Sequence, residues 1–359
     1  MLATPSSRLI FGLIPWYSAL IVTGICVALW LAGREEKRLN LPRDTVIDLA
    51  LWVIPFGVVG ARLYYVAFAW NTFASHPLSI LFVWQGGLAI YGGILGGLLA
   101  IILFAKKKRL SLPLLTDMIV PGLALAQAIG RWGNYFNMEA YGLEISNPAW
   151  QFFPLAVLIP GPSGSSWHMA TFFYESVWNL MVFAALYVLR KRTRRPGDLT
   201  LWYMLLYGTG RLIIEGLRTD SLMAAQDTLR ISQVLSVVLC LISLFIWASR
   251  SFFVDIRKHP LRSLATFAVL IGLYLLLPCP VSAFVGYHAA CLVLMLLSAM
   301  LLTARLVRLS VLPLLSIVLT IIIRTWFAVL GFDGIEAATV LNMVLSLSLL
   351  TTGVFAYFA

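Results

Sequence analysis

The sequence predicts an all-α, polytopic integral membrane protein, and three observations support this class. Of its 359 residues, 61% are hydrophobic and 11% are charged, with a mean hydropathy of +0.92. Soluble domains are closer to half apolar and a quarter charged. Apolar stretches long enough to cross a bilayer recur along the whole sequence. Basic residues gather in every second loop between these stretches, which argues against a soluble protein with a large core.

The expected spans follow one another between basic linkers. Residues 9–33 lack a basic leader and precede charges instead of a small-residue cleavage site, so we expect a retained first helix. Linkers at 34–43, 106–109 and 190–195 then separate pairs of core spans, expected at 47–69, 86–105, 113–130, 171–189, 199–215 and 231–249. After the linker at 250–262, further spans are expected at 264–278, 284–304, 311–331 and 338–358. The sequence therefore predicts about seven core helices plus about four C-terminal ones.

The excess of positive charge indicates orientation. The sequence carries 26 Lys and Arg against 15 Asp and Glu, a net charge of +11. Because the basic residues follow the positive-inside pattern, they indicate contact with anionic lipid headgroups and not a nucleic-acid partner. The pattern places the N-terminus outside and the C-terminus in the cytoplasm, with the loops 131–170 and 216–230 on the outer face.

Two further features concern ligands and domain organisation. The four cysteines lie in apolar runs without paired spacing, which is typical of small core side chains. The sequence also contains no HExxH motif, no Cys/His cluster, no acidic triplet with metal-ligand spacing and no P-loop, so we expect no metal and no cofactor. The composition changes near residue 250. Residues 1–250 contain charges within apolar runs and repeated glycine pairs, which indicates the main membrane domain. The helices of 251–359 are plainer and carry no chemical constellation, so we expect additional membrane helices without a part in the chemistry.

The first chemical motif follows the fourth apolar run. It combines a guanidinium, two carboxamides and a carboxylate in the stretch Gly130-Arg131-Trp132-Gly133-Asn134-Tyr135-Phe136-Asn137-Met138-Glu139. Such groups are costly in lipid and usually serve a substrate or a pathway. Since the planar fork of an arginine suits a phosphate better than a point charge does, the motif favours phosphate binding.

The second motif is rich in glycine. Glycines four residues apart, Gly92 with Gly96 and Gly93 with Gly97, leave one face of the third span bare, and close helix packing is the first interpretation. Tyr91 at the start of this span is a candidate to face a lipid headgroup.

The third motif lies in the sixth span. Spacings of four, four and three residues put a polar set on one helical stripe: Tyr207, Arg211, Glu215 and Arg218. An Arg–Glu pair that only neutralises itself is the alternative, but it leaves the other polar groups of the stripe unexplained. A further charge, Arg62, lies within the second span and should face a partner, for which Asp117 and Glu175 are candidates.

In this order the motifs resemble those of the prolipoprotein diacylglyceryl transferase family, over about residues 9–250. One branch of that family has a histidine where this sequence has Tyr91. The sequence departs from the family before Thr171, where His-Pro is usual and Met169-Ala170 stands here, so we expect His168 to be a solvated loop histidine.

The resemblance implies transfer of diacylglycerol from phosphatidylglycerol to the lipobox cysteine of prolipoprotein signal peptides, in the bacterial cell membrane. The implied catalytic residues are Arg131, Arg211, Tyr91, Glu139 and Glu215. The implied substrate-binding residues are Arg131, Asn134, Asn137, Gly133, Tyr17, Tyr207, Arg218, Glu175 and Arg62. In this scheme the thiol attacks the glyceryl carbon that bears the phosphate, and the arginines offset charge on the departing glycerol phosphate.

Two other functions remain open: a phospholipid-binding transporter, and a different phospholipid headgroup transferase. The sequence contains no pair of broken helices at matching positions of its two halves, which weakens the transporter hypothesis.

Overall fold

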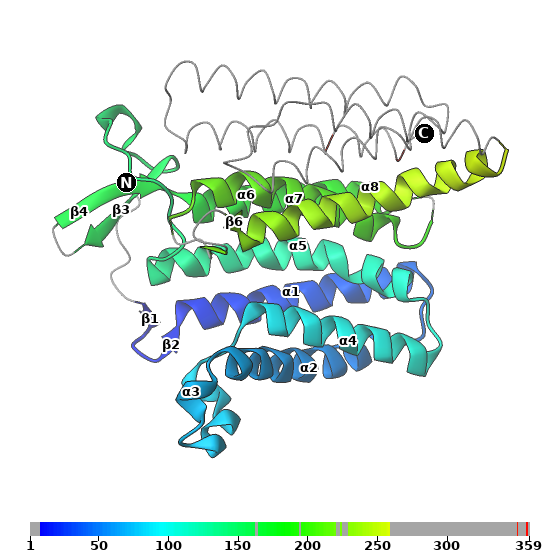
Figure 1. Ribbon diagram of the computed structural model, residues 1–359, viewed down its shortest axis with the longest axis horizontal. Helices are drawn as coiled ribbons and strands as arrows, with labels where there is room; N and C mark the ends of the chain where they lie inside the picture. The colour runs from blue at the N-terminus through cyan, green and yellow to red at the C-terminus, as the bar shows by residue number, and fades with distance from the viewer. Residues whose placement is uncertain are drawn as a thin grey trace. The chain divides into compact units, whose positions relative to one another are not determined.

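The computed structural model describes residues 8–161, 164–193, 195–219, 223–224 and 229–258, together with residues 350 and 357. The long helices of this part are α1 (Trp16–Arg38), α2 (Thr45–Phe68), α4 (Ile90–Lys108), α5 (Leu112–Asn137), α6 (Thr171–Leu189), α7 (Asp198–Leu217) and α8 (Ile231–Lys258) (Figure 1). Five of them, α1, α2, α4, α5 and α6, are long and apolar enough to cross a membrane. The protein is therefore mostly helical with several candidate membrane spans, as the sequence predicts. The spans expected after residue 258 lie outside the described residues, apart from positions 350 and 357 of the last one.

The helices agree with the expected spans to within a few residues, apart from α1 at its start and α5 and α8 at their ends. The first helix begins seven residues later than the expected position 9, because Leu9–Ile10 and Ile14–Pro15 pair as the strands β1 and β2. α5 continues through the first motif to Asn137, and α8 continues to Lys258. A short helix and two 3₁₀ turns connect α2 to α4: α3 (Trp70–Phe73), η1 (Pro77–Leu81) and η2 (Val83–Gln85).

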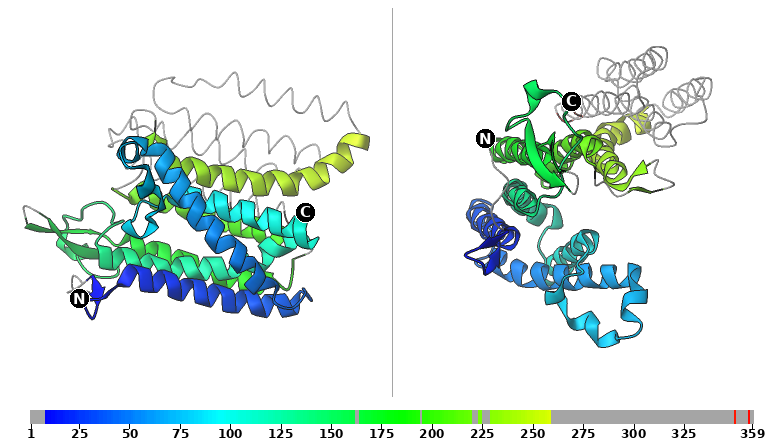
Figure 2. Two further views of the ribbon diagram at one scale, coloured as in Figure 1. Left: turned by 90° about the horizontal axis from the view of Figure 1, so that it is seen from below. Right: turned by 90° about the vertical axis from the view of Figure 1, so that its left-hand side faces the viewer.

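Small antiparallel hairpins are the departure from an all-helical fold. The longest pairs β3 (Ala156–Gly161) with β4 (Gly164–Met169), directly before α6, and it extends beyond the start of that helix (Figure 2). A shorter one pairs β5 (Met223–Ala224) with β6 (Leu229–Arg230), and a 3₁₀ turn η3 (Pro148–Trp150) precedes β3.

The chain divides into two compact units, each described by itself. The first contains Met1–Ile21, Gln127–Val182 and Leu201–Ala359, and the second contains Val22–Ala126 and Phe183–Thr200.

Within the second unit, α2 and α4 cross in close backbone contact (Figure 1). A Cβ atom on Gly92 would lie 2.3 Å from the carbonyl oxygen of Gly60, and one on Gly96 would lie 2.2 Å from that of Phe56. The packing interpretation of the glycine motif is therefore confirmed for these two positions. At Gly93 a Cβ atom would have its nearest neighbour at an ordinary 3.6 Å.

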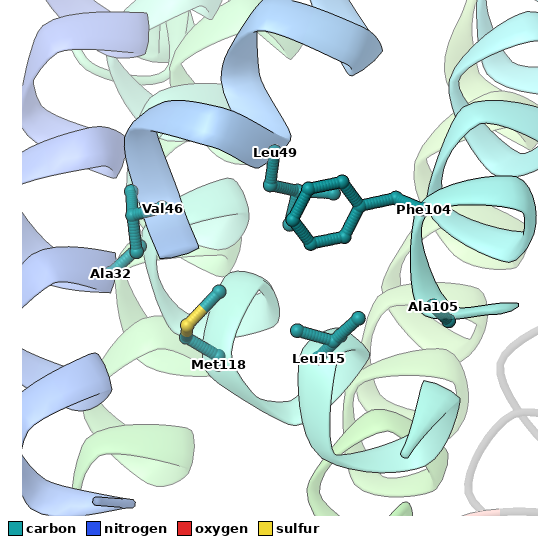
Figure 3. Packing of buried hydrophobic residues seen from close by; sticks show 7 residues of the cluster. All are labelled: Ala32, Val46, Leu49, Phe104, Ala105, Leu115 and Met118. Atoms are coloured by element: carbon teal, nitrogen blue, oxygen red, sulfur yellow. The ribbon is translucent and has the colours of Figure 1, made fainter. Parts of the chain in front are cut away.

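A buried apolar cluster lies in the second unit, near the start of α2 and the end of α4 (Figure 3). Its members come from α1, α2, α4 and α5 and interlock around the Phe104 ring: Ala32, Val46, Leu49, Phe104, Ala105, Leu115 and Met118. Because lipid is as apolar as these side chains, their close packing, more than removal from water, holds the helices together.

Candidate active site

Three arginines of the first unit surround one buried carboxylate. Glu175, in the second turn of α6, is only 4% exposed. Its Oε2 atom contacts Nε of Arg131 on α5, and its Oε1 atom contacts Nη1 of Arg211 on α7. Nη1 of Arg218, directly after α7, lies 3.7 Å from the same Oε1. Glu175 therefore joins guanidinium groups from two other elements.

A second buried carboxylate completes this arginine cluster. Glu215 is 1% exposed, and its Oε2 atom lies 2.6 Å from Nη2 of Arg211, one helical turn earlier. Three guanidinium groups thus gather around two buried carboxylates. A group of several fork-shaped donors of this kind is suited to binding an anion.

The cluster brings together five residues that the sequence singles out, and it corrects one expectation. Arg131, Arg211, Glu215 and Arg218 come from the first and third motifs. Glu175 was a candidate counter-ion for Arg62, but it pairs with these arginines instead. Spacing within one helix indicates the pair of Arg211 with Glu215, whereas it cannot indicate a contact between α6 and two other segments.

The end of α5 holds the polar remainder of the first motif. The side-chain amides of Asn134 and Asn137 donate to Oε1 of Glu139, at 3.0 and 3.2 Å. Glu139, one of the implied catalytic residues, is thus held against the two carboxamides. Its backbone N–H donates to the carbonyl of Asn134 at 3.0 Å, and that of Met138 donates to the carbonyl of Tyr135 at 3.1 Å. These two bonds form a Schellman cap, with Met138 at the position where glycine is usual.

Beyond this cap, a small cleft opens between the end of α5 and strand β3. Residues from both elements line it: Asn134, Tyr135, Met138, Glu139, Tyr141, Val157, Leu158, Ile159 and Phe172. Polar groups of the first motif thus face an apolar strand.

The segment after Glu139 is tied to both neighbouring helices. The hydroxyl of Thr171 donates to the carbonyl of Ala140 at 2.5 Å, and the N–H of Leu143 donates to the carbonyl of Leu217 at 3.0 Å. His168 lies on β4, where Nδ1 donates to the carbonyl of Gly142 at 2.9 Å and Nε2 lies 2.9 Å from the hydroxyl of Ser166. The expectation of a solvated loop histidine is therefore wrong, because His168 lies in a strand and its ring contacts Gly142 and Ser166.

Two glycines let aromatic rings of the first unit lie close to its helices, Tyr17 against α5 and Trp178 against α7. A Cβ atom on Gly133 would lie 2.5 Å from the ring of Tyr17, the second residue of α1, so this glycine lets the ring lie against α5. On α7, a Cβ atom at Gly210 would lie 1.9 Å from the indole nitrogen of Trp178. Trp178 was not singled out by the sequence. Its indole donates to a carbonyl of α7 at 2.9 Å and packs beside the Tyr207–Arg211 segment.

The remaining candidates, Tyr91 and Arg62, lie in the second unit. Tyr91 is the second residue of α4, and its ring centroid lies 6.5 Å from that of Tyr64. Arg62 donates to backbone carbonyls of the segment before α4 and not to Asp117. Asp117 accepts instead from the N–H groups of Gly197 and Thr200, at 2.7 and 2.8 Å, at the start of α7. The expected Arg62–Asp117 pair is therefore wrong.

Comparison with known proteins places this geometry in context. A sequence model described as prolipoprotein diacylglyceryl transferase matches residues 8–249. A phosphatidylglycerol–prolipoprotein diacylglyceryl transferase of Shouchella clausii is 39% identical over 246 residues, covering 68% of this chain and 88% of the relative. Proteins of the same name from Geobacillus kaustophilus and Enterococcus faecalis are 44% identical over 243 residues and 43% identical over 235 residues. These alignments cover 66% and 64% of this chain, and 87% and 84% of the relatives.

Proposed function

Since the chain belongs to the prolipoprotein diacylglyceryl transferase family, we propose that it moves the diacylglyceryl group of phosphatidylglycerol to a cysteine thiol of a prolipoprotein. The observation that carries this proposal is the arginine cluster around Glu175. Its three guanidinium groups and their fork-shaped donors suit the phosphate of the lipid headgroup.

In the proposed reaction the cysteine sulfur attacks the glyceryl carbon that bears the phosphate. A C–S thioether bond forms, the C–O bond to the phosphate breaks, and glycerol phosphate leaves with the electron pair. The thiol loses its proton to solvent or to a nearby base. Because a free thiol has a pKa near 8.5, cations close to the sulfur favour the reactive thiolate.

The residues of the first unit divide the work as follows. Arg131 and Arg211 bind the phosphate and stabilise the charge that develops on the leaving group. Glu175 and Glu215 hold these guanidinium groups in place, and Arg218 adds a third positive charge. The remaining polar groups bind headgroup hydroxyls or hold one another: Tyr17, Asn134, Asn137, Glu139 and Tyr207, with Gly133 giving Tyr17 its approach to α5.

Tyr91 has a separate proposed role. A phenol has a pKa near 10 and is a poor base at neutral pH, so we assign Tyr91 to positioning the headgroup or the thiol. Arg62 is left out of the substrate-binding set, because backbone carbonyls take up its donors.

The membrane arrangement is also a proposal. We assign about seven spans to residues 1–250 and about four to residues 251–359. The positive-inside pattern supports an N-terminus outside the cell membrane, a C-terminus in the cytoplasm and a site open to the outer face, where lipid and prolipoprotein signal peptide meet. The tail 251–359 follows the matched segment 8–249, which supports treating it as an addition to the catalytic domain.

The proposal is tested by incubating a lipobox peptide with the purified protein and phosphatidylglycerol, followed by mass analysis. A diacylglyceryl adduct on the cysteine is expected, and a peptide with serine at that position should remain unchanged. A phospholipid transporter would leave both peptides unchanged, and a different headgroup transferase would consume the lipid without modifying the peptide. Arg131→Lys and Arg211→Lys should each abolish most of the adduct, because lysine keeps the charge but loses the fork.

A further inference from the structure

The guanidinium of Arg62 is saturated by main-chain oxygens. Arg62 lies in α2 and is 6% exposed. Its acceptors are five backbone carbonyls of one short segment: Ile80 at 2.8 Å from Nε, Gly86 at 2.7 Å and Gly87 at 3.0 Å from Nη1, and Ser79 at 2.7 Å and Phe82 at 3.4 Å from Nη2. A guanidinium has five N–H groups, so its donor capacity is met by this segment. Phe73 covers one face of the group, with its ring centroid 5.0 Å from Cζ.

The segment that Arg62 binds has an unusual backbone. It consists of the two 3₁₀ turns η1 and η2, followed by Gly86 and Gly87 with φ angles of 90° and 68°. In turns of this kind several carbonyl groups have no partner within a helix. A guanidinium group has only donors, so it can satisfy several such carbonyls at once. A Cβ atom on Gly87 would lie 2.7 Å from Nη1 of Arg62 and 2.7 Å from the Tyr65 ring. Glycine at this position is therefore required by the contact itself.

The same stretch of α2 also determines where α4 begins. The carbonyl of Ala61, the neighbour of Arg62, accepts from the N–H of Ala89 at 3.0 Å. Ala89 is the N-cap residue of α4, and Tyr91 is the second residue of that helix. Arg62 and Ala61 thus hold the chain on both sides of residue 88, two to five residues before Tyr91.

We propose that Arg62 is a positioning residue for Tyr91: it clamps the segment 79–87 and so places the first turn of α4. The proposal rests on the proposed function in that it assigns Tyr91 to the reacting lipid or thiol. Lysine cannot replace the clamp, because its ammonium group has three donors on a flexible stem and no planar fork. In this role Arg62 contacts no substrate.

Hydrogen–deuterium exchange of the full-length protein tests the clamp without any activity. In Arg62→Lys, the amides of residues 79–89 should exchange about tenfold faster or more, because bonds from a charged donor to this segment are lost. Residues 139–145 of the first unit should exchange as in the unchanged protein. Arg43→Lys, the same substitution at an exposed linker position, should alter neither segment. Unchanged exchange at 79–89 in Arg62→Lys would overturn the clamp.

Kinetics of peptide lipidation test the link to Tyr91. Arg62→Lys should lower kcat by on the order of tenfold, while the KM for phosphatidylglycerol changes less than about twofold. In a Tyr91→Ala background the same substitution should cost less than about twofold, because its effect passes through the missing side chain. Equal costs in both backgrounds, or a rise in KM alone, would overturn the positioning role.

A second variant keeps the proposal testable if Arg62→Lys does not fold. Gly87→Ala keeps the charge of Arg62 but forces a methyl group into the clamp, so it should speed exchange at 79–89 and lower kcat in the same way. Normal exchange and normal kcat in a well-inserted Gly87→Ala would contradict the proposal. If the unchanged protein makes no peptide adduct, the proposed function fails, whereas the exchange experiment still decides the clamp.

Discussion

Removing the charge of Glu175 is the sharpest perturbation of the arginine cluster. Glu175→Gln keeps the size of the side chain and one carbonyl acceptor, but it turns the other oxygen into an amide donor that faces a guanidinium. The residues that Glu175 holds come from α5, from α7 and from directly after α7. The substitution also removes one negative charge from among these guanidinium groups. The substitution therefore acts on the relative placement of two helices and on the charge that they carry.

The expected magnitude follows from the burial of the carboxylate. Breaking a buried ion pair by removing one partner costs about 3–5 kcal/mol, because the other charge stays buried without compensation. At 4% exposure Glu175 belongs to this class, and its three contacts place the loss toward the upper end. A loss of this size should lower Tm by roughly 10 °C for a protein of this size. Misplaced arginines should also lower kcat by about 10²-fold.

Thermal unfolding in detergent and the peptide lipidation assay measure the two effects. Glu144→Gln is the matched control. It makes the same substitution at an exposed position between α5 and β3, so it should change neither the Tm nor kcat. Phosphatidylglycerol should raise the Tm of Glu175→Gln more than that of the control, because a bound anion offsets the added charge. If Glu175→Gln has the Tm and the kcat of Glu144→Gln, Glu175 does not organise the cluster.

Four further experiments, two of them with a second substitution as control, test other parts of the structure by thermal unfolding. Met138→Gly should stabilise the protein by up to about 1 kcal/mol, because Met138 adopts a φ of 54° at a helix cap that favours glycine; a lower Tm would contradict this. Gly96→Ala should cost about 1–3 kcal/mol through its clash with a carbonyl of α2, whereas Gly93→Ala should be nearly neutral, and equal effects would refute the helix contact. Asp117→Asn should cost about 1–3 kcal/mol by weakening charge-assisted bonds at the start of α7, so an unchanged Tm would count against that cap. Tyr357→Ala should cost about 1–3 kcal/mol, because this ring packs on two tryptophans of α7 and α8 at 5.2 and 5.4 Å; Tyr357→Phe should retain most of the stability, and a loss as large as that of alanine would refute ring packing as the cause.

The helices could be predicted closely where apolar runs end at charges. α6 has the expected limits 171 and 189, since a basic linker follows it directly. The hairpins could not be predicted in this way. Residues 9–15 are mostly apolar, so hydropathy merges β1 and β2 with α1, although Gly12 turns the chain with a φ of 74°. The tip of the β3–β4 hairpin looks like a loop because its Gly and Pro residues carry the turn signal and its short strands do not.

The site could be predicted in its residue types but not in its contacts. Charges inside apolar runs indicate Arg131 and Arg211, and helical spacing indicates the partner Glu215. The central position of Glu175 depends on how α5, α6 and α7 pack against one another. The spacing of residues within one helix carries no information about this packing. The left-handed backbone on both sides of Glu139, at Met138 and Ala140, also escapes prediction, because neither residue favours positive φ.

Arg62 and the arginines of the cluster differ in what satisfies their guanidinium groups. Arg62 is surrounded by neutral carbonyl dipoles, which use its donors one for one. The arginines of the cluster are held instead by two carboxylates, which are themselves charged. A guanidinium whose donors are all taken up by main-chain carbonyls can only hold its own backbone, whereas guanidiniums gathered around shared carboxylates keep a geometry that suits an anion. The acceptors around each side chain therefore separate the structural role of Arg62 from the proposed phosphate-binding role of Arg131 and Arg211.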